Sequence, residues 1–518
     1  MKKVLLLLAA CYLGANQMSA QDTKSACGMS AADQMLFDER LLNNIEKMRS
    51  GQVVRERGAI QYVPVHFHLV GDAQGAGRVK ESRVLDQLCA LNKAYEAMDL
   101  RFYLRPHQTL GTLFNYNINS ANVYTNQTSW LTMYNNRHTN ALNVFVVDEA
   151  VPLGSTGGDD GEILGYYNPT RDWVVCKRSR VNGSASNSTL PHEVGHFFSL
   201  KHTFVGWEGT SFGPGSAGWP VAPTKAPDGT PTELMNQLNC TVAADKLCDT
   251  PPDYNFGYGN SGCIYDEGAK DPMGVLVDPM ENNMMGYFES CNPYEFTQEQ
   301  ENVVLADRAS TDRNYLNNTF APIATEITTP ANLLNSPANG ATTAYYDQVL
   351  LEWKPVTGAT YYLVEVDFIF AYNSPTAQSH VVSSTSKLIT GLDPDKTYYW
   401  RVRPFNEYVT CAEPRQQSFK TSITSAVRDI EGLTALQVAP NPVRDGIATL
   451  FVQADRNFEA NLQVFDATGR QVYAQSGLNF TNGDSTVELP LTGLQNGLYF
   501  VMLQNNAGQA VRKFTVLR

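Results

Sequence analysis

Three histidines and one glutamate within a short stretch constrain this sequence more than any other feature. His192 and His196 are four residues apart, so in a helix both imidazoles lie on one face and can reach the same metal ion. His202 follows six residues later and can supply a third ligand if the helix ends and the chain turns beneath the metal. Glu193 directly follows the first histidine, where it can take a proton from a metal-bound water. The spacing therefore predicts a catalytic zinc site with three protein ligands.

The composition is that of a large, acidic, exported protein. A length of 518 residues suggests three or four domains. The net charge of −13 argues against a nucleic-acid binder. Beyond the N-terminus, no apolar run is long enough to predict a membrane-spanning helix.

Residues 1–20 have the pattern of a secretory signal peptide. Two lysines precede an apolar run, and Met18-Ser19-Ala20 then ends in two small residues before a cleavage point. The alternative is a lipoprotein signal with Cys11 acylated. Either route takes the chain out of the cytoplasm, so disulfide bonds can form.

The segment before the metal motif predicts an α/β domain with a twisted sheet. Residues 60–71 alternate as a strand, with His66 and His68 on one face. These two histidines could chelate a metal, but without further ligands we expect them to be structural or solvent-facing. An apolar helical face covers residues 84–98, and further strands are expected at 100–104 and 142–147.

The residues just ahead of the metal helix predict a loop and its cap. Residues 161–167 are expected to form a loop that feeds an exposed edge strand, which could bind an extended substrate by β-addition. An ordinary surface loop is the alternative. Thr189 is expected to cap the metal helix, with Pro191 tolerated in its first turn.

A methionine turn, Met284-Met285-Gly286-Tyr287, lies about eighty residues after His202. The pattern H-E-x-x-H-x-x-x-x-x-H with such a turn downstream resembles the metzincin zinc endopeptidases. Together with Cys248-Asp249-Thr250-Pro251-Pro252 and Phe296-Thr297-Gln298-Glu299-Gln300, it is similar to the pappalysin or cytophagalysin branch. The resemblance covers roughly Cys27 to Leu316.

The resemblance implies roles for single residues. Glu193 would be the general base and acid of peptide hydrolysis. Met285 would pack beneath the metal, and Tyr287 would approach the zinc or stabilise the tetrahedral intermediate; for both, simple core packing is the alternative. The implied zinc ligands are His192, His196 and His202.

The sequence departs from the family pattern at Ser199, three residues after His196. The family usually has glycine there, which eases the turn that carries the chain to the third ligand. Serine adopts such a backbone only at some strain. The departure therefore concerns the turn and leaves the ligand set intact.

The resemblance also implies a structural calcium ion. Its ligands would come from Asp245, Thr250 and the backbone near Cys248, because calcium requires oxygen-rich loops. An acidic turn closed by Pro251 and Pro252 is the alternative.

Four of the eight cysteines that remain after removal of the signal lie between residues 240 and 291. Connectivity does not follow from sequence, but we expect the pairs Cys240–Cys248 and Cys263–Cys291 to pin irregular loops. After them, Thr297 and Gln300 predict a capping box that starts a helix running through Leu316.

Cys27-Gly28 resembles the cysteine switch of latent metzincins. A thiolate is an excellent zinc ligand and would hold the water position until the propeptide is removed. The alternative is a disulfide with another unpaired cysteine. Residues around Arg55 to Arg57 offer a processing point, so we expect a short propeptide at 21–57 and a catalytic domain at 58–320.

Two all-β sandwich modules are expected after the catalytic domain. Residues 325–423 resemble a fibronectin type III domain with Tyr398 as its tyrosine corner, and its expected role is spacing or adhesion. Residues 436–518 resemble the C-terminal sorting domain of the type IX secretion system, for which another small β-sandwich is the alternative.

The sequence thus predicts a multidomain protein with an α/β metzincin catalytic domain. We expect a secreted zinc endopeptidase made as a zymogen, with protein or peptide substrates and the type IX secretion machinery as partners. We expect no nucleic-acid partner and no transmembrane helix in the mature chain. The alternative is a catalytically inert surface adhesin that binds through the fibronectin-like module, although the intact Glu193 argues against it.

Overall fold

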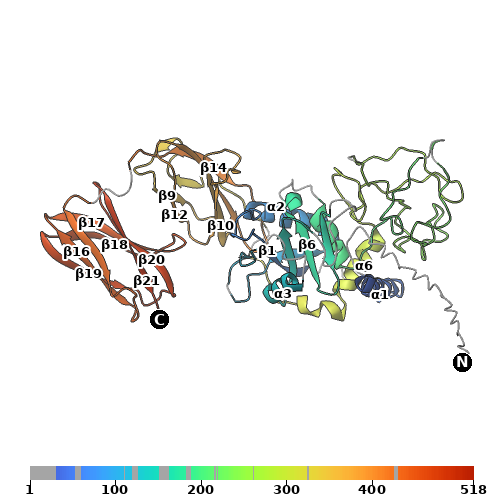
Figure 1. The fold of residues 1–518 in the computed structure, drawn as a ribbon, viewed down its shortest axis with the longest axis horizontal. Coiled ribbons are helices and arrows are strands. Elements are labelled where there is room, and N and C mark those ends of the chain that lie inside the picture. Colours follow the sequence, from blue (N-terminus) through green and yellow to red (C-terminus); the bar gives the residue numbers. More distant parts are fainter. Residues whose placement is uncertain are drawn as a thin grey trace, which may run out of the picture.

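The computed structural model describes residues 31–52, 60–109, 111–119, 127–150, 163–181, 188–214, 218, 220–260, 262–323, 326–424 and 430–518. The expected signal segment, Cys27, the processing point at Arg55 to Arg57 and the loop residues 161 and 162 lie outside these ranges. The described parts form a row, with an irregular coil at one end, then an α/β region, then two groups of strands (Figure 1).

A mixed sheet runs through the α/β region. Its strands are β1 (Gln61–Leu69), β2 (Leu100–Leu104), β3 (Phe114–Asn115), β4 (Leu142–Val147), β5 (Gly165–Asn168) and β6 (Trp173–Lys177). Their order is β2-β1-β4-β6-β5, with β3 also paired to β1. The pairs are parallel except β5 with β6, which is antiparallel. Strand β5, which follows the expected loop, is therefore an edge strand, but its residues Gly165 to Tyr167 are buried instead of exposed.

Helices cover both faces of this sheet. They are α1 (Ala31–Arg49), α2 (Glu81–Ala94), α3 (Gln127–Asn136), α4 (Arg178–Val181), α5 (Thr189–Phe197) and α6 (Gln298–Arg308), with the 3-10 turns η1 (Glu96–Met98) and η2 (Thr311–Leu316). Residues of α2 and α5 share one core with β1, β4 and β6, and Met133 of α3 packs on the opposite face of β4 and β6. The helix predicted over 84–98 divides at Tyr95, and the one predicted through Leu316 divides after Arg308.

Strand β1 is buried on both faces from Val63 to Leu69, whereas alternation alone suggests a half-exposed strand. The reason is that parallel strands are covered by helices on both sides. His66 and His68 consequently lie inside the protein, with the rings of His107 and His138 also centred 5.3 and 5.7 Å from that of His66.

These histidines are held by neutral hydrogen bonds. His68 Nε2 pairs with Asn143 at 3.0 Å, and His66 Nδ1 donates to the Arg105 carbonyl at 2.8 Å. Burial lowers the pKa of His66 to about 4 and that of His68 well below its usual value. Their buried, hydrogen-bonded positions fit the prediction that His66 and His68 are structural, and they contradict the prediction that these residues face solvent.

The coil between Lys201 and Phe296 is held by a small core and two disulfides. Its aromatic residues Trp207, Tyr254 and Phe256 are buried together. The disulfides are Cys240–Cys248 and Cys263–Cys291. The segment has no long helix or strand among its described residues, so these crosslinks and side-chain contacts order it.

The strands after residue 333 form two groups. The first group has the strands β7 (Leu334–Ser336), β8 (Ala341–Thr342), β9 (Gln348–Trp353), β10 (Tyr361–Asp367), β11 (Gln378–Val382), β12 (Ser386–Thr390), β13 (Thr397–Phe405) and β14 (Arg415–Lys420). They make sheets β11-β10-β13-β14-β8 and β12-β9-β7, and both sheets contribute to one buried core. In β13, the Tyr398 hydroxyl accepts a hydrogen bond from the Asp393 backbone N–H.

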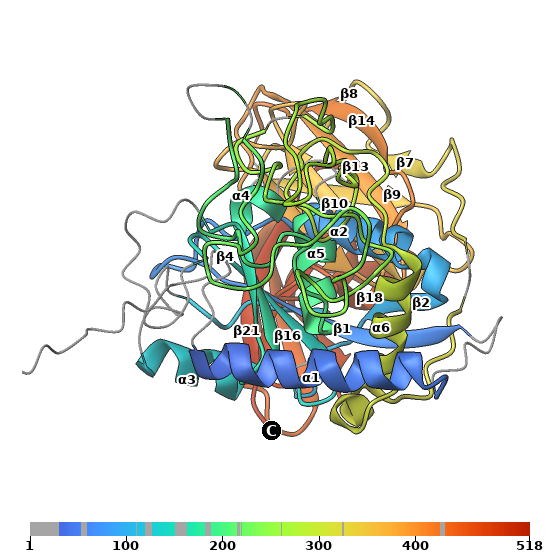
Figure 2. The same ribbon diagram turned by 90° about the vertical axis from the view of Figure 1, so that its right-hand side faces the viewer.

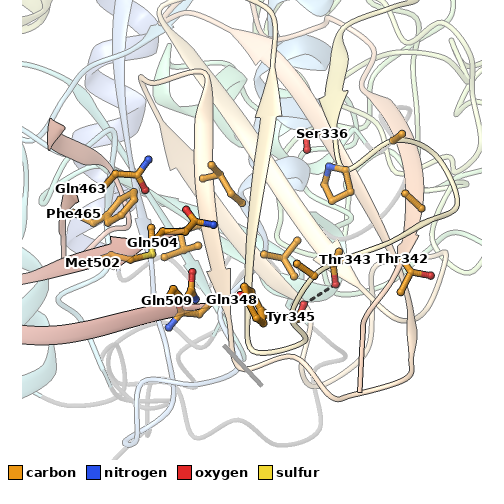
Figure 3. A pocket seen from close by; sticks show the side chains of 17 residues that line it. Ser336, Thr342, Thr343, Tyr345, Gln348, Gln463, Phe465, Met502, Gln504 and Gln509 are labelled. Atoms are coloured by element: carbon orange, nitrogen blue, oxygen red, sulfur yellow. Dashed lines mark hydrogen bonds between the residues drawn. The ribbon is translucent and has the colours of Figure 1, made fainter. Parts of the chain in front are cut away.

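The second group has the strands β15 (Leu433–Ala439), β16 (Ile447–Ala454), β17 (Phe458–Asp466), β18 (Gln471–Phe480), β19 (Gly483–Pro490), β20 (Gly497–Gln504) and β21 (Gln509–Val516). They make sheets β15-β16-β19 and β18-β17-β20-β21, which share a second core. A cavity of about 400 Å³ lies between the two groups, with Gln348 on one side and Gln463 and Gln504 on the other (Figure 3).

The first group of strands is joined firmly to the α/β region. The disulfide Cys89–Cys411 links α2 to the segment after β13 across 322 residues of sequence. Arg403 forms an ion pair with Asp86 at 2.7 Å. Leu363 and Phe405 belong to the same core as the helices of the α/β region. This disulfide is not evident from the sequence, because nothing in the spacing of the cysteines favours it.

Among the described residues, no helix is long and apolar enough to cross a membrane.

The buried histidines predict a loss of stability in acid. His66 binds a proton less readily in the folded chain, where its pKa is about 4, than in the unfolded chain, where it is 6.5. Stability is therefore fully present above about pH 6.5 and falls as the pH drops towards 4. His66→Asn keeps a donor for the Arg105 carbonyl but does not titrate. Between neutral pH and about pH 5, we expect this variant to lose about 2 kcal/mol less unfolding free energy than the parent. Thermal unfolding at about pH 7.5 and pH 5 measures it, and equal losses in both proteins would contradict it.

Candidate metal centre

Helix α5 carries the first two histidines and the glutamate. Its N-cap residue is Ser188, so the prediction of Thr189 as the cap is wrong. Ser188 has a helical backbone (φ −81°, ψ −8°) and its side chain makes no capping hydrogen bond, so the helix starts without the usual extended cap. Pro191 lies in the first turn as expected, and its carbonyl accepts a 3.0 Å hydrogen bond from the buried Tyr95 hydroxyl.

The three histidines converge. His196 Nε2 and His202 Nε2 are 3.2 Å apart, and one ligand atom from each of His192, His196 and His202 lies within 4.8 Å of the others. Within the described ranges, this group is the one whose spacing suits a metal ion. All three side chains are buried. Three imidazole nitrogens at this spacing match the donor set that zinc takes in catalytic sites.

Backbone carbonyls fix the orientation of two of the rings. His192 Nδ1 lies 2.8 Å from the Met284 carbonyl and His196 Nδ1 lies 2.7 Å from the Leu200 carbonyl. A carbonyl only accepts hydrogen bonds, so each Nδ1 carries the proton and each Nε2 keeps its lone pair for a metal.

Burial also keeps these rings neutral. It lowers the pKa of His192 to about 4 and the pKa values of His196 and His202 well below the ordinary value. Histidines that are unprotonated at neutral pH can bind a metal without first losing a proton.

The Glu193 side chain fits closely against β5. A Cβ atom on Gly165 would lie 3.0 Å from the Glu193 Cγ and Oε1 atoms, so this glycine makes room for the carboxylate. The Tyr167 backbone N–H donates to the carboxylate, while its Oε2 has no partner within the described residues. Burial raises the pKa of Glu193 to about 8. The sequence gives no signal for the role of Gly165.

The methionine turn lies directly under α5. Met285 is fully buried, and a Cβ on Gly195 would lie only 2.5 Å from its Sδ atom, so the helix and the turn are in close contact.

Asn283 accepts from the Met285 backbone N–H at 2.9 Å and exchanges two amide hydrogen bonds with Gln300. Gln300 also completes the predicted capping box with Thr297. The start of α6 thereby supports the turn whose Met284 carbonyl orients His192.

Tyr287 lies beside the ligands. Its ring centroid is 4.9 Å from that of His202 and 5.9 Å from that of His192. It also contacts the ring of Phe204, so its position fits both a role at the metal and packing.

The turn to the third ligand begins at Ser199, which has a φ of 66°. This left-handed backbone is the conformation for which the family pattern has glycine. Serine therefore occupies the strained turn that the sequence indicated, and the chain still delivers His202 to the other ligands.

Two of the residues expected to bind calcium, Asp245 and Thr250, are buried among other carboxylates. Asp249 Oδ1 and Glu233 Oε2 lack hydrogen-bond partners in the part of the chain that the structure describes, and the Thr250 side chain lies against the Asp245 carboxylate. Burial raises the pKa of Asp245 to about 8 and that of Glu233 to about 10. Buried oxygens of this kind normally have a partner, and a cation is one kind of partner that would suit them.

Cys27, the predicted switch, lies outside the described residues, so the structure does not place it. Among the described cysteines, Cys176 in β6 is the one outside a disulfide. It is buried, and burial raises the pKa of its thiol well above the usual value. Such a thiol is a poor metal ligand or nucleophile.

Known proteins match different parts of the chain. Residues 437–517 match the family described as the secretion system C-terminal sorting domain. An extracellular metalloprotease of Neurospora crassa is 29% identical over 256 residues, which are 46% of this chain and 71% of that protein. An extracellular metalloprotease of Colletotrichum graminicola is 25% identical over 264 residues, 46% of this chain and 73% of that protein.

Two solved structures are similar in part. A promirolysin mutant of Tannerella forsythia is 18% identical, covers 55% of this chain and 92% of its own, and has a TM-score of 0.36. The fn3 domain of the human collagen alpha-1(XX) chain is 23% identical, covers 20% of this chain and 95% of its own, and has a TM-score of 0.15.

The buried histidine triad and the similar proteins support a metallopeptidase. Its C-terminal residues form a secretion-system sorting domain. The protein is exported, either released from the cell or kept at its surface.

Proposed function

We propose that this protein is a secreted zinc endopeptidase of the metzincin type, similar to the pappalysins. The observation that supports it best is the convergence of His192, His196 and His202 in one buried site with Glu193 on the same helix. The substrates would be extracellular proteins or peptides, and export would use the type IX machinery through the sorting domain. We propose the domain limits predicted above, 58–320, 325–423 and 436–518.

His192, His196 and His202 would hold the zinc ion through their Nε2 atoms. Bound zinc would polarise the scissile carbonyl and lower the pKa of a water molecule. Glu193 takes the proton from the attacking water and returns it to the leaving amine. Its burial makes the carboxylate a stronger base than a solvated glutamate. Tyr287, next to His202, would donate a hydrogen bond to the oxyanion.

Strand β5 offers a place for the substrate backbone. It is the last strand of the sheet, and its residue Gly165 contacts Glu193. A peptide that pairs with the outer edge of β5 would lie extended beside the base.

Substitution of the base separates catalysis from metal binding. We expect Glu193→Gln to lower the rate of casein cleavage by roughly 100- to 10,000-fold, because proton transfer is lost. The zinc content of the variant should equal that of the secreted, processed parent, and a chelator should abolish the parent's activity. Metal analysis and a casein assay of both proteins measure this.

Two outcomes would contradict the enzyme hypothesis. One is cleavage that survives complete removal of the metal. The other is a zinc-loaded parent that cleaves neither casein nor gelatin, which would favour the inert adhesin instead.

Latency through Cys27 is a second part of the proposal. In the full-length chain the Cys27 thiolate would bind the zinc and exclude water. We expect full-length Cys27→Ala to cleave casein without processing, at a rate at least tenfold above the unprocessed parent. Cys176→Ala, which removes the buried thiol of β6, is the matched control and should remain latent. A Cys27→Ala chain as latent as the parent would show that another segment causes latency.

We also propose a structural calcium ion bound by Asp245, Thr250 and the Cys248 carbonyl. The support is the buried carboxylate of Asp245, which lies near the carboxylate of Glu233 and beside the Thr250 side chain. A divalent cation would offset the repulsion between Asp245 and its neighbours Asp249 and Glu299.

Calcium should therefore stabilise the protein. We expect millimolar calcium, compared with a calcium chelator, to raise the melting temperature by several degrees. Asp245→Asn should abolish the increase, whereas Asp228→Asn, on an exposed turn of the same coil, should not. The proposal is wrong if calcium leaves the melting temperature of the parent unchanged.

A further inference from the structure

Helix α1 lies within the segment predicted to be a propeptide, yet it is part of the core. Phe37, Leu41 and Ile45 are buried in the same core as the metal helix. The ring of Phe37 is centred 6.0 Å from that of His196. Figure 2 shows α1 running across the molecule below α5 and beside α6.

Asn44 of α1 makes the contact that concerns the metal centre. Its side chain is 2% exposed. One amide hydrogen is donated to the Ser199 hydroxyl and the other to Asp307 of α6, each at 2.9 Å. Both hydrogens of the amide are thus used, which fixes the orientation of the side chain.

Ser199 is the residue with the strained backbone on the path between the second and third ligands. Its N–H donates to the His196 carbonyl at 2.9 Å. The next residue, Leu200, provides the carbonyl that orients His196. A change in the backbone at Ser199 would therefore move a partner of one ligand and the approach of the chain to His202.

The other end of the network is anchored by an ion pair and ring contacts. Asp307 also pairs with the buried Arg313 at 2.6 Å. Arg313 donates to the Phe197 carbonyl at the end of α5 and lies 3.8 Å from the centre of the Phe197 ring. Asn44 thus links Ser199 to side chains that also hold the last turn of the metal helix.

We propose that Asn44 is a positioning residue for the metal centre. Its hydrogen bond holds Ser199 in the left-handed conformation that glycine would adopt unaided, so that His196 and His202 face one metal ion. Helix α1 therefore belongs to the metal-binding form of the protein. A cut that removes Cys27 then falls before Ala31, and the catalytic domain begins at α1 instead of at residue 58. The inference rests on the proposed zinc function.

The test uses Asn44→Ala, Ser199→Gly and the double variant in the full-length chain. Asn43→Ala, on the exposed side of the same helix, is the matched control. Zinc affinity is measured by competition with a chelator, and ligand geometry by the visible spectrum of the cobalt-substituted protein. We expect Asn44→Ala to weaken zinc binding by roughly 10- to 100-fold and to change the cobalt spectrum. Ser199→Gly and Asn43→Ala should bind zinc as the parent does.

The double variant decides between positioning and general stability. Glycine needs no support at this φ, so Asn44→Ala should cost less than threefold in zinc affinity when residue 199 is glycine. If Asn44→Ala does not fold, Ser199→Ala replaces it, because alanine keeps the strained backbone but lacks the hydroxyl. Ser199→Ala should then lower the zinc affinity, whereas Ser199→Gly should not.

Three results would overturn the inference. Unchanged zinc affinity and cobalt spectrum in Asn44→Ala would do so, as would an equal loss in the parent and Ser199→Gly backgrounds. A parent chain that binds no zinc would overturn both this inference and the proposed function, so the two failures are distinguishable.

Discussion

The metal centre depends on one backbone feature, the left-handed turn at Ser199 that reverses the chain after helix α5. An α-helix can bring two ligands to one face, but it cannot bring a third from six residues further on without such a turn. The turn is held by Asn44, which is distant in sequence, and Arg313 holds the end of α5 just before it through the Phe197 carbonyl. The site is therefore a product of tertiary packing, even though all its ligands lie in a short stretch.

Burial has opposite effects on the two kinds of side chain at this centre. It lowers the pKa of the histidines and raises that of Glu193, so both are neutral at moderate pH in the metal-free protein. A divalent cation would reverse the balance for the glutamate, since its charge favours the ionised carboxylate. The four side chains are all buried, so the surrounding sheet and helices shield them from solvent.

The features that the sequence predicts well are local ones. The strands at 100–104 and 142–147, and the capping box at Thr297, follow from patterns within a few residues. The prediction of Thr189 as the N-cap of α5 was wrong. The cap is Ser188, whose backbone is helical, and side-chain preference does not reveal such a backbone. The roles of Gly165 and Asn44 could not be predicted, because they depend on contacts with residues distant in sequence. Gly165 contacts Glu193, and Asn44 contacts Ser199 and Asp307. The Cys89–Cys411 disulfide could not be predicted for the same reason, because its cysteines are far apart in the sequence.

The Cys89–Cys411 disulfide ties the maturation of the protein to the order in which the chain is made and exported. Cys411 lies 322 residues after Cys89, so the covalent closure of the α/β region waits until most of the polypeptide has been synthesised. It also requires an oxidising compartment. The crosslink that joins α2 to the segment after β13 therefore forms after the chain has left the cytoplasm.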